Sequence, residues 1–300
     1  MAFALEPPER LARTLGETYG DRAAGWLAAL PALAAEAVAE HRVTVERVVE
    51  PGGRSGLVLL ARRPDGAPAT LKIVPPFAAP GLEQVALAHW KGRGAAELLG
   101  TGAGALLLER LHPEMSLRSL PEAKSLLEAA DTVRKLWVAP PPEHGFESVA
   151  DRTARQAAAM RSAAAADGAL APLVTAALAA RDELCASAGE TVLLHGAFRQ
   201  GKVLAGDRAP WLAVGPEPVT GERAYDLARL ARDRVEDLVA AAPGASSTRR
   251  RVRRLAESLD MDQERLRGWA LFRAVESGTR ALTLGRRQDA EVLLEYASWL

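Results

Sequence analysis

The chain has 300 residues, of which 48% are hydrophobic and 25% are charged, and its 38 basic side chains balance 38 acidic ones. This length and composition allow a large hydrophobic core divided between two lobes, and the formal net charge of +0 excludes a global field that would attract nucleic acid or an anionic membrane surface. The single cysteine, Cys185, excludes an internal disulfide, and the five histidines lack the spacing of a zinc site.

The N-terminal segment is predicted to be helical. Residues 8–40 are rich in alanine and amphipathic, with an interruption expected at Pro31, so we predict one or two helices. No apolar run reaches the roughly 18 residues of a membrane span, and the charged and proline residues at 6–9 are unlike a secretory signal. We therefore expect a cytoplasmic protein that is not bound to a membrane.

A small β-rich lobe is predicted next. Alternating apolar residues indicate three β-strands: 43–49, 57–60 and 69–74. Gly52 and Gly53 lie in the turn between the first two strands, and Lys72 lies inside the third. A helix is predicted over 82–93, and a further apolar strand over 105–111.

The rest of the chain is predicted to be mostly helical. Four segments have helical spacing: 121–137, 148–166, 170–188 and 222–238. Two or three further helices are expected from residue 246 to the end, with Gly244 and Gly268 as their separators.

One strand–loop–strand motif interrupts these helices. Residues 195–204 read H-G-A-F-R-Q-G-K-V-L. The apolar run 191–194 precedes this loop, and the runs 202–204 and 211–214 follow it as the two arms of a hairpin. The second arm breaks at Gly215, which is followed by a proline.

The order and spacing of these motifs resemble the aminoglycoside phosphotransferase family, most closely its streptomycin 6-phosphotransferase and hydroxyurea-resistance branch. The family pattern is H-G-D-x-x-x-x-N-V-L, then a strand ending I-D-P-K, then G-[DE]-x-x-Y-D. The matching residues here are His195, Gly196, Val203, Leu204, Pro216, Gly221, Glu222, Tyr225 and Asp226. The resemblance implies an α+β fold of the bilobal protein-kinase type. We expect a β-rich N-lobe with its helical extension over 1–111, and a larger, mainly α-helical C-lobe over 112–300.

The chain departs from the family pattern where the chemistry lies. Ala197 stands where the family has its catalytic aspartate, Lys202 where it has a metal-binding asparagine, and Gly215 where it has a metal-binding aspartate. Glu217 stands where a lysine is usual. Alanine and glycine offer no side-chain oxygen, and an ammonium group repels the cation whose ligand it replaces. We therefore predict no intact catalytic residue and no metal site.

Other site residues are implied by the resemblance. Nucleotide contacts are assigned to the positions Gly52, Gly53, Lys72, Glu83, Glu109 and Leu111. In the family the strand lysine meets the nucleotide phosphates, and Glu83 is its candidate partner, although a shift of register would place Val85 there instead. Glu109 and Leu111 lie where the family contacts adenine through backbone atoms. His195, Gly196, Tyr225 and Asp226 are expected to be structural, with the aspartate bracing the loop.

Three functions remain open from the sequence. The first is a pseudokinase that binds a small molecule, a partner protein or a nucleotide such as ATP without magnesium, in which Lys202 contacts phosphate directly. The second is an active phosphotransferase in which Glu217 reaches a metal and Glu222 or Asp226 orients an aminoglycoside-like acceptor. The third is a structural or regulatory subunit without a ligand. The basic run 249–254 is interpreted as a solvated helix face, so no nucleic-acid partner is expected.

Overall fold

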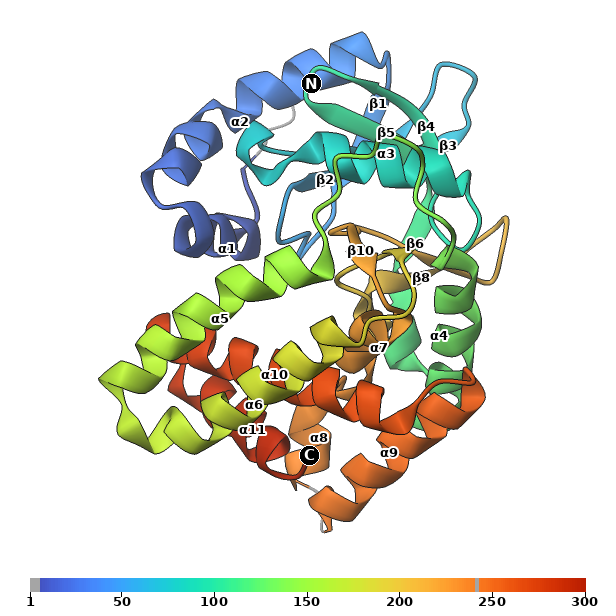
Figure 1. Cartoon of the computed structure of the whole chain (residues 1–300). Helices are drawn as coiled ribbons and strands as arrows, with labels where there is room; N and C mark the ends of the chain where they lie inside the picture. The colour runs from blue at the N-terminus through green and yellow to red at the C-terminus, as the bar shows by residue number, and fades with distance from the viewer. Residues whose placement is uncertain (1–5, 241–242) are drawn as a thin grey trace. The chain divides into compact units, whose positions relative to one another are not determined.

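The computed structural model describes residues 6–240 and 243–300 (Figure 1). The chain forms two compact units, the first comprising the part up to Ser116 together with Leu204–Val214, and the second comprising Leu117–Val203 and Gly215–Leu300. The predicted division after residue 111 differs from this one. Strand β6 (Leu111–Ser116) pairs with β8 (Val203–Gly206), so the hairpin that continues into β9 (Trp211–Ala213) clusters with the N-terminal unit.

A five-stranded antiparallel sheet forms the centre of the first unit. Its strands are ordered β1-β2-β3-β5-β4, with the bounds β1 (Thr44–Val48), β2 (Leu57–Arg62), β3 (Pro68–Ile73), β4 (Leu98–Gly102) and β5 (Ala105–Glu109). The four predicted strands of this lobe are confirmed within a few residues at each end. Strand β4 was not predicted, because two glycines in five residues hide its alternation.

Two helices precede the sheet and pack on it. Helix α1 (Glu9–Tyr19) ends at Gly20, whose φ of +55° favours glycine, and α2 (Asp21–Glu40) begins directly afterwards. The predicted interruption at Pro31 is wrong, because this proline lies exposed inside α2. The buried face of α2 belongs to the core of this unit, and that burial stabilises the helix despite the lost amide donor.

Helix α2 is the one helix, within the ranges 6–240 and 243–300, that is long and apolar enough to cross a membrane by length and composition. Its residues Trp26, Leu30 and Ala34 are buried in the hydrophobic core of the first unit. Helix α3 (Pro80–Trp90) lies where the helix 82–93 was predicted, and it packs against β4.

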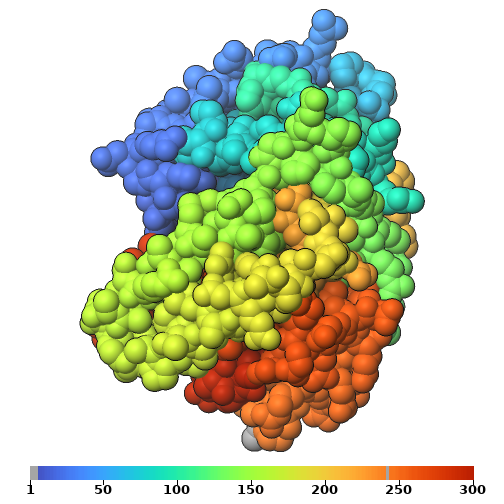
Figure 2. Space-filling model, viewed as in Figure 1, coloured from blue at the N-terminus to red at the C-terminus, as the bar shows by residue number. Residues whose placement is uncertain are grey.

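The second unit is mainly helical. Its helices are α4 (Glu122–Leu136), α5 (Val149–Ala166), α6 (Ala171–Ala186), α7 (Arg223–Ala231), α8 (Val235–Ala240), α9 (Gly244–Ser258), α10 (Gln263–Thr283) and α11 (Arg287–Ser298). Helix α10 packs against α5, α6, α7, α9 and α11 and carries the fully buried Phe272. Helices α5 and α6 lie side by side on the surface of this unit (Figure 1, Figure 2).

Two predictions for these helices are corrected by the structure. The segment 222–238 is not one helix, because α7 ends at Ala231 and α8 begins at Val235, and Arg234 between them has a φ of +55°. Gly268 does not separate two helices but lies inside α10. A Cβ atom at Gly268 would lie 2.9 Å from Leu184 Cδ1, so the glycine allows α6 to approach α10 closely.

A pair of short antiparallel strands presents the motif loop. Strand β7 (Val192–Leu194) pairs with β10 (Val219–Gly221), with Leu194 opposite Val219 and Val192 opposite Gly221. The loop starts at His195, directly after β7, and passes through one turn of 3₁₀ helix, Gln200–Lys202, before β8. The predicted strand at 202 therefore begins one residue later.

Candidate functional site

Asp226 braces the start of the loop, as the family resemblance implies. Its side chain is fully buried and accepts hydrogen bonds from the backbone amides of His195 and Gly196, both at 2.7 Å. Burial raises the pKa of Asp226, while the nearby Arg273 guanidinium and the two amides act in the opposite direction. The Asp226 carboxylate therefore holds the backbone at the start of the loop in place.

Arg273 fixes the same turn from α10. It donates to the carbonyl oxygens of Tyr225 and Gly196, both at 2.9 Å, and its guanidinium lies 4.2 Å from the centre of the Tyr225 ring. These contacts are of the kind that the expected structural role of Tyr225 and Asp226 requires, and that role stays a prediction. Arg273 itself was missed, because one arginine in a helical pattern carries no sign of its tertiary contacts.

Gly196 is required by a close approach of two chain segments. Its φ is +74°, and a Cβ atom at this position would lie 2.0 Å from the Glu217 carbonyl oxygen. Arg152 closes the same region by donating from Nη1 to that carbonyl oxygen at 3.0 Å. The Arg152 hydrogen bond and the absence of a side chain at Gly196 thus allow the backbone at 196 and 217 to lie close together.

Lys202 links the two positions at which the family binds metal. Its ammonium group donates to the Gly215 carbonyl oxygen at 2.7 Å and lies 3.2 Å from Glu217 Oε1. The Lys202 side chain is 18% exposed, whereas that of Glu217 is 57% exposed. The structure therefore brings together Lys202, Gly215 and Glu217, and a cationic side chain occupies the centre of the group.

The charges of this group act on each other. Burial lowers the pKa of Lys202 to about 8, against the Glu217 carboxylate, which raises it, and the nearby Arg229 and Arg199 lower it further. The Lys202 ammonium holds the pKa of Glu217 well below its usual range. Because Glu217 is largely exposed, water screens this ion pair, and we expect it to contribute little to stability.

The side chains at these positions do not fit a magnesium ion. Ala197 is fully buried and offers only a methyl group, while its amide donates to His195 Nδ1 at 3.3 Å. Gly215 has no side chain, and Lys202 presents a positive charge. In the described part of the chain, no group of three or more His, Cys, Asp or Glu side chains could hold a metal ion.

Lys72 and Glu83 form a buried ion pair in the first unit. Lys72 Nζ lies 2.7 Å from Glu83 Oε1 and 2.6 Å from Oε2, and both side chains are less than 10% exposed. The predicted pairing of the β3 lysine with Glu83 is confirmed. Val85, the alternative partner position, is 41% exposed. Phosphate binding by Lys72 stays a prediction.

The glycine turn of the same unit is tight. Gly52 has a φ of +74°, and a Cβ atom there would lie 2.9 Å from the Val49 carbonyl oxygen. A Cβ atom at Gly53 would lie 2.9 Å from the Gly56 carbonyl oxygen. Both glycines are thus required by the backbone of the turn, and their contact with a nucleotide stays a prediction.

Glu109 and Leu111 lie at the junction between β5 and β6. The Glu109 carboxylate accepts from Arg208 Nε and Nη2, at 3.1 and 2.8 Å, and from the backbone amide of Glu97 at 2.9 Å. Leu111 is buried and pairs with Gly206 in the β6–β8 ladder. These contacts show how the junction is held, while its predicted role in adenine binding is not tested by them.

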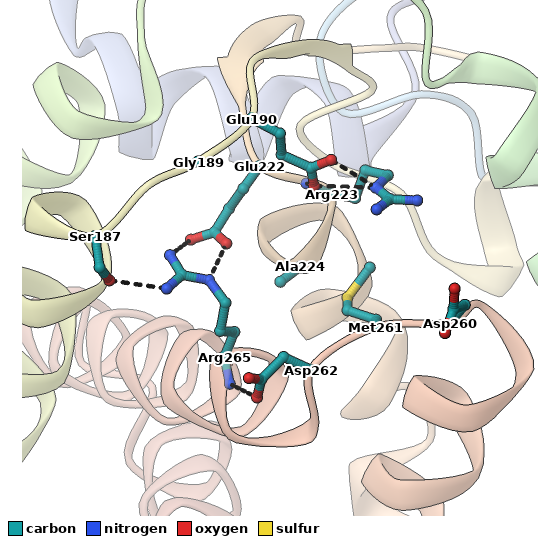
Figure 3. A pocket seen from close by; sticks show the side chains of 10 residues that line it. All are labelled: Ser187, Gly189, Glu190, Glu222, Arg223, Ala224, Asp260, Met261, Asp262 and Arg265. Atoms are coloured by element: carbon teal, nitrogen blue, oxygen red, sulfur yellow. Dashed lines mark hydrogen bonds and ion pairs between the residues drawn. The ribbon is translucent and has the colours of Figure 1, made fainter.

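A separate pocket lies at the other end of the β7–β10 strand pair, in the second unit (Figure 3). It has a volume of about 290 Å³ and is lined by Ser187, Gly189, Glu190, Glu222, Arg223, Ala224, Asp260, Met261, Asp262 and Arg265. Glu222 follows Gly221, which pairs with Val192, so it lies at the end of this strand pair away from His195. Its carboxylate accepts from Arg265 Nε at 2.6 Å and Nη2 at 2.9 Å. Glu222 is thus engaged in this pocket rather than in the motif loop.

Comparisons with known proteins agree with this geometry. Residues 41–285 match the family model described as aminoglycoside/hydroxyurea antibiotic resistance kinase. The chain is 31% identical over 277 residues to streptomycin 6-kinase of Streptomyces glaucescens, covering 91% of this chain and 90% of that protein. It is 34% identical over 251 residues to hydroxyurea phosphotransferase of Kitasatospora aureofaciens, covering 81% and 69% of the two chains.

Solved structures show the same fold at low sequence identity. A thermostable mutant of aminoglycoside phosphotransferase APH(4)-Ia, in ternary complex with ADP and hygromycin B, superposes with a TM-score of 0.61 at 16% identity, covering 87% of this chain and 95% of that one. Aminoglycoside phosphotransferase APH(3'')-Id from Streptomyces rimosus, in complex with ADP and streptomycin, gives a TM-score of 0.52 at 16% identity, covering 84% and 98%. With its kinase-like fold and its family match over most of its length, this chain belongs to the aminoglycoside/hydroxyurea antibiotic resistance kinase family.

Proposed function

We propose that this family member is a pseudokinase, which binds a nucleotide such as ATP without magnesium and transfers no phosphoryl group. One observation carries the proposal. The Lys202 ammonium lies 2.7 Å from the Gly215 carbonyl oxygen and 3.2 Å from the Glu217 carboxylate, at the position where the family pattern has a metal ligand. A lysine held there supplies a positive charge of its own beside a phosphate group.

The missing groups are those that phosphoryl transfer needs. A carboxylate must orient the acceptor hydroxyl, and oxygen ligands must hold the metal that bridges the phosphates. With Ala197 in place of the carboxylate, general-base assistance worth about 10²–10⁴-fold is absent. Metal neutralisation, worth several kcal/mol more, has no ligands at Lys202 or Gly215. The two losses need not add, but together they remove ordinary kinase turnover.

Nucleotide binding is supported by the first unit. The buried pair of Lys72 and Glu83 is intact, with both oxygens of the carboxylate within 2.7 Å of the ammonium. Two related solved structures contain ADP. A cytoplasmic location, where ATP is abundant, goes with this proposal.

An active phosphotransferase is the second candidate, and the exposure of Glu217 favours it. This carboxylate is 57% exposed and could turn towards a metal ion. The two carboxylates that would have to orient the acceptor are engaged elsewhere. Asp226 accepts hydrogen bonds from two backbone amides, and Glu222 is paired with Arg265. Activity would therefore depend on Glu217 alone.

Thermal unfolding with ATP distinguishes the two candidates. A ligand that binds only the folded state raises the unfolding midpoint. We expect ATP with EDTA to raise the midpoint as much as ATP with magnesium, and Lys72→Met to abolish the increase. Lys135→Met is the matched control, because Lys135 is an exposed lysine paired with Asp131 on α4. A second assay follows phosphate transfer from ATP to streptomycin and to hydroxyurea.

The proposal predicts no transfer above the rate without protein. Stabilisation that requires magnesium, or turnover that Glu217→Ala abolishes, would instead establish the active phosphotransferase. If ATP changes the midpoint under neither condition, the protein does not bind the nucleotide and the proposal is wrong.

A further inference from the structure

The pocket beside β10 has no part in the proposed nucleotide binding. Four chain segments of the second unit enclose its volume of about 290 Å³: the end of α6, the residues before β7, the start of α7, and the turn between α9 and α10 with the first residues of α10. This volume is close to the lower end of the range for small-molecule sites in proteins. The lining residues include neither the motif loop nor any predicted nucleotide contact, so a ligand of this pocket would be a separate molecule.

Two ion pairs hold the walls of the pocket in place (Figure 3). Glu222, whose side chain is 6% exposed, accepts from Arg265 Nε at 2.6 Å and Nη2 at 2.9 Å, and Arg265 Nη1 donates to Ser187 Oγ at 2.8 Å. Glu190 accepts from Arg223 Nε at 2.9 Å and from the backbone amide of Arg223 at 3.0 Å. Each of these carboxylates is neutralised by a guanidinium group. The walls are therefore formed before a ligand enters, which lowers the cost of ordering them on binding.

Two further carboxylates, on the turn between α9 and α10, lack a basic partner. Within residues 6–240 and 243–300, the exposed Asp260 side chain makes neither a hydrogen bond nor an ion pair within 4 Å, and Figure 3 shows it away from both ion pairs. Asp262 caps α10 through Oδ1, which accepts from the backbone amides of Glu264 and Arg265, and its Oδ2 is not used. Four acidic and two basic residues line the pocket, so two negative charges remain for a ligand to neutralise.

The lining favours an organic cation over a metal ion. In the part of the chain that the structure describes, no group of three or more His, Cys, Asp or Glu side chains could hold a metal. Ala224 and Met261 also line the cavity and offer an apolar surface to a hydrocarbon chain. A short aliphatic amine satisfies both conditions, because its methylene groups contact this surface while its ammonium groups lie near the unpaired carboxylates.

We propose that this pocket binds a small aliphatic cation, whose ammonium groups are held by Asp260 and Asp262 and whose hydrocarbon chain lies against Met261. The inference goes beyond the proposed function and does not depend on it, since it requires neither ATP nor Lys202. It also gives a role to Glu222, the residue of the family pattern that the motif loop does not use. Glu222 fixes the guanidinium of Arg265 and so holds one wall of the pocket.

The probe for this site is 1,4-diaminobutane. Its binding is measured by titration calorimetry without nucleotide, at about pH 7, where alkylammonium groups are charged. We expect a dissociation constant below about 1 mM, and we expect Asp260→Asn combined with Asp262→Asn to weaken binding about 10-fold or more, because both attracting charges are lost. Asparagine tolerates the φ of +49° at position 260 and caps a helix as well as aspartate does at position 262. The double variant should therefore stay folded, which circular dichroism checks.

A second pair of carboxylates in the same unit supplies the matched control. Asp167 is the exposed N-cap of the 3₁₀ turn before α6, and Asp289 is exposed in the first turn of α11. Asp167→Asn with Asp289→Asn removes the same net charge away from the pocket and should change the affinity by no more than about 2-fold, because salt screens distant charges. Butanedioate, a dianion with the same number of carbon atoms as the probe, should not bind.

Four results would overturn the inference: no binding of 1,4-diaminobutane to the unaltered protein, equal affinity of the variant altered at 260 and 262, an equal loss of affinity in the control variant, or equally tight binding of butanedioate. The two proposals fail separately. Binding of 1,4-diaminobutane without binding of ATP refutes the proposed nucleotide binding and keeps the cation site, whereas binding of ATP alone does the reverse.

Discussion

Breaking the buried ion pair of the first unit should cost a large share of its stability. The change is Glu83→Gln, which keeps the shape of the side chain and removes its charge. Lys72 would then keep a buried ammonium without a counter-charge, where two contacts of 2.6 and 2.7 Å exist now. Because the two side chains are only 9% and 8% exposed, we expect a loss of about 3–5 kcal/mol in the free energy of unfolding.

The exposed pair of Lys135 and Asp131 supplies the matched comparison. These side chains are 48% and 65% exposed at i,i+4 spacing, so Asp131→Asn should cost only about 0.3–0.5 kcal/mol. Urea unfolding followed by tryptophan fluorescence and by circular dichroism measures both losses. A double-mutant cycle with Lys72→Met should recover most of the loss caused by Glu83→Gln, since no unpaired charge then remains. Equal losses for the buried and exposed carboxylates would refute the reasoning.

Three further predictions concern the motif loop. Gly196→Ala would place a methyl group 2.0 Å from the Glu217 carbonyl oxygen, so the midpoint of thermal unfolding should fall by several degrees. An unchanged midpoint would contradict this packing. The folded pKa of Lys202 is about 8, lower than its unfolded value, so the unfolded chain holds this proton between about pH 8 and 10 while the folded protein has lost it. Stability should therefore rise from about pH 8 to 10 and be unaffected by this group below pH 8, and Lys202→Met should reduce that rise in pH-dependent unfolding. Combining Ala197→Asp, Lys202→Asn and Gly215→Asp should make the stabilisation by ATP depend on magnesium. Aspartate is one of the residues that adopt a φ of +60°, as at position 215, and Asp226 and Arg273 hold the loop backbone whatever side chains it carries. A folded variant without this magnesium dependence would show that the loop has moved.

Short-range periodicity in the sequence was sufficient to predict the strands and helices that show it. The alternation around Lys72 predicted β3, and the helix that follows placed Glu83 within its reach, because both depend on short-range periodicity. The break between α1 and α2 was misplaced, since the sequence shows Pro31 more clearly than the backbone requirement that puts Gly20 there. Strand β10 was missed because three residues are too few to show alternation.

The contacts of the motif loop lie beyond such patterns. The resemblance identified Lys202 and Gly215 as altered positions, but the hydrogen bond between them joins residues 13 apart across a loop. Arg273 gave no signal at all, because its hydrogen bonds to the backbone at 196 and 225 depend on how α10 packs against that segment. A single sequence reports residue types, whereas the balance of charge at a site depends on tertiary packing.

The clamp of Asp226 and Arg273 has a consequence for how this loop tolerates change. Both side chains grip main-chain atoms, the amides of 195 and 196 and the carbonyl oxygen of 196, and neither hydrogen-bonds to a side chain at 197 or 202. The backbone conformation of this segment therefore does not depend on the side chains at 197 and 202, which determine its chemistry. Substitutions at 197 and 202 can exchange one ligand preference for another while the scaffold persists, which makes the loop a ready starting point for laboratory evolution of new specificities.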